Sequence, residues 1–73
     1  MAINYAYNYA YIDPATNMCM EVRSSTSDAQ GNYENWVEIP VCDQDYILKY
    51  YNWDNGKFYY DPEYTQEYIS PLL

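Results

Sequence analysis

The sequence has no histidine, and its 73 residues include only two glycines, two cysteines and three basic residues. Common catalytic bases, metal ligands and glycine-rich phosphate loops are therefore missing, and no serine-nucleophile motif occurs. Cys19 and Cys42 fit no metal pattern, because zinc ligands come in closer pairs. We interpret them as reduced thiols, with a disulfide as the alternative. The chain is predicted not to be an enzyme and to need no metal or other cofactor.

Basic residues are too few to balance the acidic ones. Three Lys or Arg stand against 11 Asp or Glu, which gives a formal net charge of -8 at pH 7. Such a charge disfavours contact with a phosphate backbone, so nucleic acid is not expected as a partner. The acids are spread along the chain, which favours a role in solubility. Complementarity to a basic partner protein is the alternative.

Long apolar runs are also missing. No window approaches the roughly 18 apolar residues of a membrane-spanning helix, and the N-terminus lacks the pattern of a signal peptide. We therefore expect no membrane partner. The protein is expected in a cytoplasm, unless it is built into a particle.

The apolar content that is present comes mainly from 12 Tyr and 2 Trp. Tyrosine is amphipathic, so these rings suit half-buried sheet faces and interfaces better than a dry core. A chain of this length buries only about 60% of the surface that its unfolded form exposes. We predict one domain over residues 1–73 that gains stability by forming a homodimer or a larger homo-oligomer.

Residues 50–60 carry the strongest local signal, because two aromatic runs flank Asp54, Asn55 and Gly56. An Asn-Gly pair between strand-forming residues is typical of a tight hairpin with a type I′ turn, in which both central residues have positive φ. Exposed aromatic residues often dominate protein interfaces. The predicted partner-binding residues are those of this hairpin: Tyr50, Tyr51, Trp53, Phe58, Tyr59 and Tyr60.

Residues 2–12 alternate between large apolar residues, mostly tyrosines, and small or polar ones. This period of two predicts a strand with one aromatic face and one small face. The small face is expected either to lie close to another backbone or to stay in water. The aromatic face is the predicted self-association surface, formed by Tyr5, Tyr7, Tyr9 and Tyr11.

Further strands are predicted over residues 18–23, 33–41 and 64–69, and a short helical turn over residues 43–49. Asp43 is the predicted N-cap of that turn, because an aspartate side chain accepts hydrogen bonds from the first free backbone N–H groups. The strand over residues 18–23 is expected to return antiparallel to the first, since residues 13–17 form a turn.

Three segments are expected to limit the sheet. Pro40 indicates an edge strand or a strand end, because proline cannot donate to a ladder. Residues 24–32 are predicted to be a mobile polar loop, and residues 70–73 a C-terminal tail. The predicted fold is all-β, or β-rich α+β: a small antiparallel sheet of four to five strands with a tight hairpin and one short helical turn.

The order of these features resembles small accessory proteins encoded near the tail-fibre genes of tailed phages. The resemblance rests on residues 9–13, 37–41, 49–52 and 56–59, with the polar loop between the first two. It covers most of the chain, and the extended tyrosine alternation at the start departs from it. The resemblance implies a phage origin. It leaves the role open. The acidic, tyrosine-rich surface of a small chain favours an inhibitor that contacts a host defence protein stoichiometrically in the host cytoplasm. The alternative is a tail or virion component, which the resemblance favours.

Residues 53–60 are also similar to one hairpin of cell-wall (choline) binding repeats, in which aromatic rings cage a quaternary ammonium group. Those modules stack several repeats, whereas this sequence has one such hairpin. The similarity implies a cell-wall or carbohydrate-binding module as a second alternative. Convergence on a good hairpin sequence also explains it.

Overall fold

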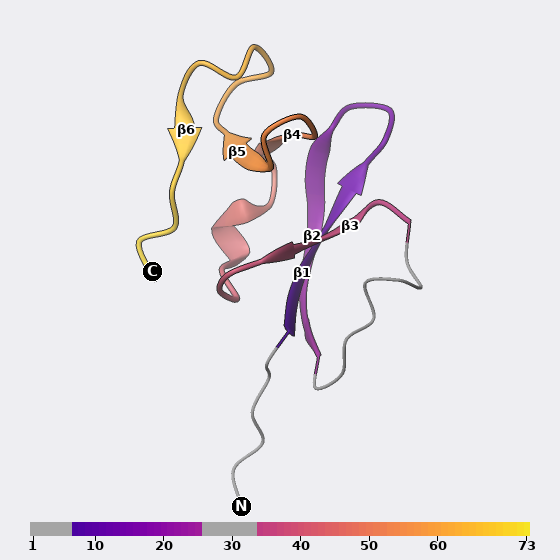
Figure 1. The fold of residues 1–73 in the computed structure, drawn as a ribbon, viewed down its shortest axis with the longest axis vertical. Helices are drawn as coiled ribbons and strands as arrows, with labels where there is room; N and C mark the ends of the chain where they lie inside the picture. Colours follow the sequence, from indigo (N-terminus) through magenta and orange to yellow (C-terminus); the bar gives the residue numbers. More distant parts are fainter. Residues whose placement is uncertain (1–6, 26–33) are drawn as a thin grey trace, which may run out of the picture.

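A computed structural model of the chain describes residues 7–25 and 34–73 (Figure 1). Its elements are β1 (Tyr7–Asp13), β2 (Met18–Ser25), β3 (Trp36–Ile39), the 3-10 turn η2 (Gln44–Tyr46), β4 (Tyr50–Asn52), β5 (Lys57–Tyr59) and β6 (Glu67–Tyr68). The six strands form one antiparallel sheet in the order β3-β1-β2-β4-β5-β6. The predicted all-β fold is therefore confirmed, with more strands than the four to five expected.

The inward face of β1 is its face of small side chains. Ala10 lies opposite Val22 of β2 and Val37 of β3, and all three residues are buried. Of the two options expected for the small face, contact with another backbone and exposure to water, exposure to water is therefore excluded for Ala10. The core cluster extends from here across the sheet and comprises Ala10, Ile12, Cys19, Val22, Val37, Ile39, Tyr46, Phe58 and Tyr68.

A β-bulge at Met20 adjusts the register between β1 and β2. Tyr11 lies opposite Glu21 and Ile12 lies opposite Cys19, so Met20 has no residue directly opposite it. The shift places Cys19 on the inward face beside Ile12. Burial raises the pKa of the Cys19 thiol to about 11, which makes it a poor nucleophile. Cys19 is a buried free thiol and Cys42 an exposed one.

β2 is longer than predicted and includes Ser24 and Ser25, which the sequence analysis assigned to the polar loop. The reason is local pairing: the Ser24 hydroxyl donates to the side-chain oxygen of Asn8 on β1, over 2.8 Å. The start of the predicted loop is therefore corrected. Its residues 26–32 lie outside the described residues.

β3 is an edge strand, as Pro40 predicted, and it ends directly before that proline. Val37 and Ile39 point into the core, while Glu38 is exposed on the other face. The predicted strand is therefore confirmed over Trp36–Ile39. The strand is shorter than the predicted range, of which residue 33 lies outside the described residues.

The hairpin of residues 50–60 is confirmed: Tyr50 lies opposite Tyr59, Tyr51 opposite Phe58 and Asn52 opposite Lys57. The type I′ assignment of its turn is wrong. Gly56 has φ of +74°, but Asn55 does not have positive φ, and four residues connect the strands.

Side-chain hydrogen bonds explain this wider turn. The Asn52 side chain accepts from the Asp54 N–H, the Asn55 side chain accepts from the Lys57 N–H, and the Gly56 N–H donates to the Asn52 carbonyl oxygen. Asparagine side chains therefore close the loop in place of the two positive φ angles of a type I′ turn.

Gly56→Val is expected to destabilise the fold by about 1–2 kcal/mol, because an L-residue at positive φ is strained. A Cβ atom at this position would lie 3.7 Å from the Tyr51 hydroxyl, an ordinary contact, so the cost comes from the backbone. Thermal unfolding monitored by circular dichroism measures the effect. The control is Gly56→Asn, because asparagine tolerates positive φ. Equal melting temperatures for the two variants would contradict this account.

η2 follows the predicted cap at Asp43, whose side chain accepts from the Asp45 N–H over 2.9 Å. The turn is of the 3-10 type and shorter than the predicted range, since its C-cap, Ile47, is already extended. Tyr46 points from it into the core, where its ring centroid lies 4.7 Å from that of Phe58. The turn thus covers the inward face of the hairpin (Figure 1).

The loop before β6 is organised by Asp61. Its carboxylate accepts from the Thr65 hydroxyl over 2.6 Å and from the N–H groups of Thr65 and Gln66. The hydrogen bond from Thr65 lowers the pKa of the Asp61 carboxyl group below its ordinary value. These contacts turn the chain back so that β6 pairs with β5. Only Glu67 and Tyr68 of the strand predicted over residues 64–69 form β6.

Candidate binding surface

The six predicted partner-binding residues are divided between the two faces of the hairpin. Phe58 is buried and Tyr51 is half-buried on the inward face, with ring centroids 4.9 Å apart. Burial raises the pKa of the Tyr51 hydroxyl. These two residues anchor the hairpin to the core, and only part of Tyr51 is accessible to a partner.

Tyr50 and Tyr59 lie opposite each other on the outward face of the hairpin, and both are half-buried. The Tyr59 ring lies 5.3 Å from that of Tyr64, and its hydroxyl accepts a hydrogen bond from the Asn55 side chain. The outward face is therefore a small, ordered aromatic cluster.

Trp53 and Tyr60 are the most exposed of the six, with 49% and 56% of their surface accessible. The Trp53 ring packs edge-on against Tyr51 at 4.9 Å, and its indole N–H donates to the Asn17 side chain. Lys49 Nζ lies 5.1 Å from the centre of the Tyr60 ring. Both rings are thus held in place while large areas of them face water.

The predicted self-association residues lie on the outward face of β1, with the exception of Tyr5, which is outside the described residues. Tyr7 and Tyr11 are half-buried, whereas Tyr9 is only 5% exposed within a single chain. Tyr9 therefore contributes to the stability of the chain itself. Self-association through these tyrosines stays a prediction.

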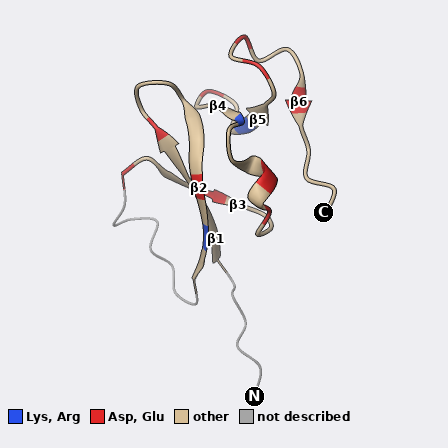
Figure 2. Ribbon diagram, turned by 180° about the vertical axis from the view of Figure 1, so that it is seen from behind, with Lys and Arg blue, Asp and Glu red and all other residues tan. Residues whose placement is uncertain are grey.

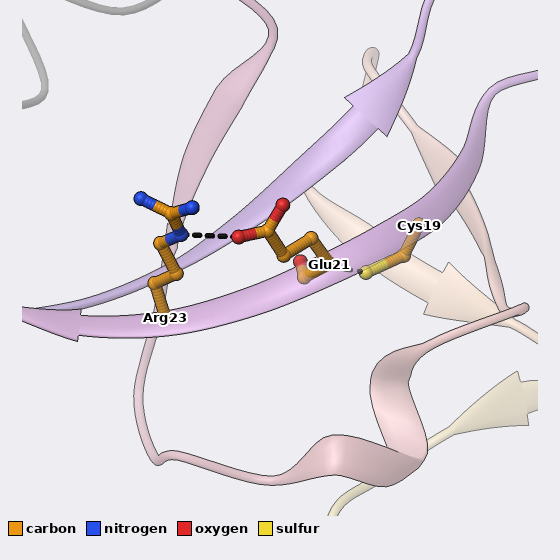
Figure 3. Close-up of polar contacts among 3 residues, drawn as sticks. All are labelled: Cys19, Glu21 and Arg23. Atoms are coloured by element: carbon orange, nitrogen blue, oxygen red, sulfur yellow. Dashed lines mark hydrogen bonds and ion pairs between the residues drawn. The ribbon is translucent and has the colours of Figure 1, made fainter.

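Charged and aromatic side chains of β2 and β3 continue this outward face. Trp36 lies 5.3 Å from the Tyr11 ring, and the Arg23 guanidinium lies 5.7 Å from the Trp36 ring centre. Arg23 also forms an ion pair with Glu21, as Figure 3 shows. Both charged side chains remain largely accessible, so this pair contributes little to stability.

A buried polar cluster joins η2 to β6, and no pattern in the sequence indicated it. The Asp43 carboxylate is buried and accepts hydrogen bonds from the hydroxyl groups of Tyr68 and Ser70. The bond from Tyr68 lowers the pKa of Asp43, while burial and this same bond raise the pKa of Tyr68. The partners are 25 residues apart or more, so no local pattern identifies them.

Lys49 extends this cluster to the surface. Its Nζ donates to the Asp45 carbonyl oxygen over 2.8 Å and lies 4.8 Å from the centre of the Tyr68 ring. Together with the contact to Tyr60, this places the ammonium group against two aromatic faces. The Lys49 ammonium group is therefore held within the chain.

A groove of about 280 Å³ lies between the end of β3 and the strands β5 and β6. Buried side chains form part of its lining, and exposed residues, acidic, basic and apolar, form the rest. Its lining residues are Glu38, Ile39, Pro40, Tyr46, Gly56, Lys57, Phe58, Glu67, Tyr68, Ile69, Ser70 and Leu73. The groove is thus lined both by Phe58, one of the predicted partner-binding residues, and by the core residue Tyr46.

Acidic residues are distributed over both halves of the sheet and its loops, as Figure 2 shows. In the groove, Glu38 stands on the β3 side and Glu67 on the β6 side. Lys57 Nζ lies 4.0 Å from the Glu67 carboxylate, at the outer limit of an ion pair. The groove therefore carries two acids and one weakly paired base.

Comparison with known proteins finds no matching family model, no matching curated protein and no matching solved structure. Within residues 7–25 and 34–73, no cluster of three or more Cys, Asp or Glu side chains is arranged to hold a metal ion. Within the same ranges, no helix has the length and apolar character needed to cross a bilayer.

Proposed function

We propose that this protein is a non-enzymatic binding protein that inhibits a partner protein by stoichiometric contact. The observation that carries the proposal is the pair of large, ordered and exposed aromatic rings of Trp53 and Tyr60 on a chain with net charge -8. Tryptophan and tyrosine dominate interface energetics because they supply large contact area at little cost in conformational entropy. The resemblance of the chain to phage accessory proteins supports a host protein as the target.

The charge of the chain supports a basic surface on that partner. Oppositely charged surfaces accelerate association and suppress wrong partners, whereas desolvated aromatic anchors slow dissociation. The two contributions respond differently to salt, because screening weakens contacts between exposed charges and leaves aromatic packing intact. High salt is therefore expected to lower the association rate constant of this protein with its partner and to leave its slow dissociation rate constant unchanged.

Affinity capture from bacterial lysate tests the proposal. The tagged chain is expected to retain a partner in stoichiometric amount, and adding the chain to the purified partner should remove the partner's activity at an equimolar ratio. Trp53→Ser is expected to weaken retention at least tenfold, the size of a hot-spot loss. The matched control is Met20→Ser, since Met20 is 48% exposed but lies on β2.

Two results would contradict the proposal. One is the absence of any partner retained in stoichiometric amount at low salt. The other is a retained partner whose activity is unchanged at saturation. Detection of the chain in purified phage particles, together with an absence of inhibition, would favour the virion component implied by the resemblance.

A further inference from the structure

We propose that the groove between β3 and β6 binds a short extended segment of a basic protein, with one aliphatic side chain inserted between Ile39 and Phe58. This inference rests on the proposed function and names the chemistry of the partner. A volume of about 280 Å³ is at the small end of ligand pockets, so it suits one or two side chains.

The composition of the groove defines what fits in it. Ile39, Tyr46 and Phe58 form its apolar floor, although each is only 2–6% exposed. Ile69 and Leu73 also line it, and both are strongly exposed. An aliphatic side chain placed here would cover apolar surface on both partners, which is the main source of binding free energy.

The charges beside the groove select a basic segment. Glu38 and Glu67 stand on its two sides, and Lys57 is only weakly paired with Glu67. A second copy of this chain would bring a further net charge of -8 to the same place, so repulsion disfavours it as the occupant. Lysine or arginine residues on either side of the inserted side chain would instead meet the two carboxylates.

The groove also lies beside two sheet edges. The Ile12 N–H donates to the Asn35 carbonyl oxygen, and this register directs the backbone groups of Glu38 away from β1. The Tyr60 N–H donates to the Gln66 carbonyl oxygen, which likewise directs the backbone groups of Glu67 away from β5. An extended segment can therefore add main-chain hydrogen bonds at either edge.

Two prolines keep this pairing short. Along each edge, every second residue directs its backbone groups away from the sheet. The next such position after Glu38 is Pro40, and the next one after Ile69 is Pro71. Proline has no N–H to donate, so neither edge supports a long added strand. The inserted side chain and the flanking charges must supply most of the affinity, which predicts a short segment with one essential aliphatic residue.

Binding of two synthetic peptides tests the inference. The first is a fluorescein-labelled, lysine-rich peptide with a single central leucine, and the second has serine in place of that leucine. The leucine peptide is expected to bind about tenfold more tightly or better, because burying a leucine side chain is worth at least that ratio. Nuclear magnetic resonance shifts on binding should centre on Glu38, Ile39 and Ile69.

A matched pair of variants locates the contact. Ile69 and Leu72 belong to the same C-terminal segment and are similarly exposed, at 66% and 61%, but only Ile69 lines the groove. Ile69→Ser should weaken the leucine peptide about threefold or more, and Leu72→Ser should leave its affinity unchanged. Equal affinity of the two peptides, equal effects of the two variants, or shifts centred away from the groove would overturn the inference.

The same variants separate this inference from the proposed function. If the tagged chain and its Ile69→Ser variant retain the same partner equally, the groove is not the contact site and the binding function stands. If neither retains a partner but the leucine peptide binds in the groove as described, the groove inference stands and the proposed inhibition fails.

Discussion

Phe58→Ala is expected to leave the protein close to unfolding at room temperature. Truncating a buried phenylalanine costs about 3–5 kcal/mol, whereas the whole stability of a chain of this length is about 4–11 kcal/mol. Phe58 is 6% exposed on a strand with neighbours on both sides, and its ring lies 4.7 Å from that of Tyr46 and 4.9 Å from that of Tyr51. The lost ring would therefore leave a cavity between η2 and the hairpin.

Urea unfolding monitored by tryptophan fluorescence measures this loss. Tyr60→Ala is the control: it removes an aromatic ring two residues away that is largely exposed, and it should cost about 1 kcal/mol or less. Similar unfolding midpoints for the two variants would show that Phe58 does not anchor the core.

The parts of the fold that local chemistry determines were predictable. The hairpin follows from Gly56 between two aromatic runs, the edge position of β3 follows from Pro40, and the cap of η2 follows from Asp43. The turn type was not predictable from the Asn-Gly pair alone. The side chain of Asn52 competes for the same backbone groups and opens the loop to four residues.

The parts that depend on distant contacts were not predictable. A period of two in β1 identifies two faces but not which one is buried, and that choice follows from Val22 and Val37 on the neighbouring strands. The bulge at Met20 has no signal of its own in the sequence. The groove lies between β3 and β6, the two edge strands of the sheet, and its lining combines Glu38 and Glu67, which are 29 positions apart in the chain.

Asp43→Ala is expected to destabilise the protein by about 2–4 kcal/mol, because it removes the cap of η2 and leaves buried hydroxyl groups without an acceptor. Those groups belong to Tyr68 and Ser70, so the substitution releases the C-terminal segment from η2. Asp45→Ala is the control, since it removes one charge from an exposed position two residues after Asp43. Urea unfolding at neutral pH compares the two variants with the wild type.

The same cluster predicts how stability depends on pH. The folded pKa of Asp43 is lowered, so its contribution is fully present above the ordinary value of 3.8 and is lost as the pH falls through the lower folded value. The folded pKa of Tyr68 is raised, so its contribution is present below the ordinary value of 10 and is lost as the pH rises further.

Asp43→Asn separates charge from shape at this position, because the amide oxygen can still accept a hydrogen bond but carries no charge. This variant should lose part of the acid-induced fall in stability below pH 3.8, and its alkaline fall should weaken because Tyr68 no longer faces a carboxylate. Asp45→Asn should keep both falls. Unfolding midpoints across the pH range measure these differences, and identical curves for wild type and Asp43→Asn would mean that the buried carboxylate does not hold η2 and β6 together.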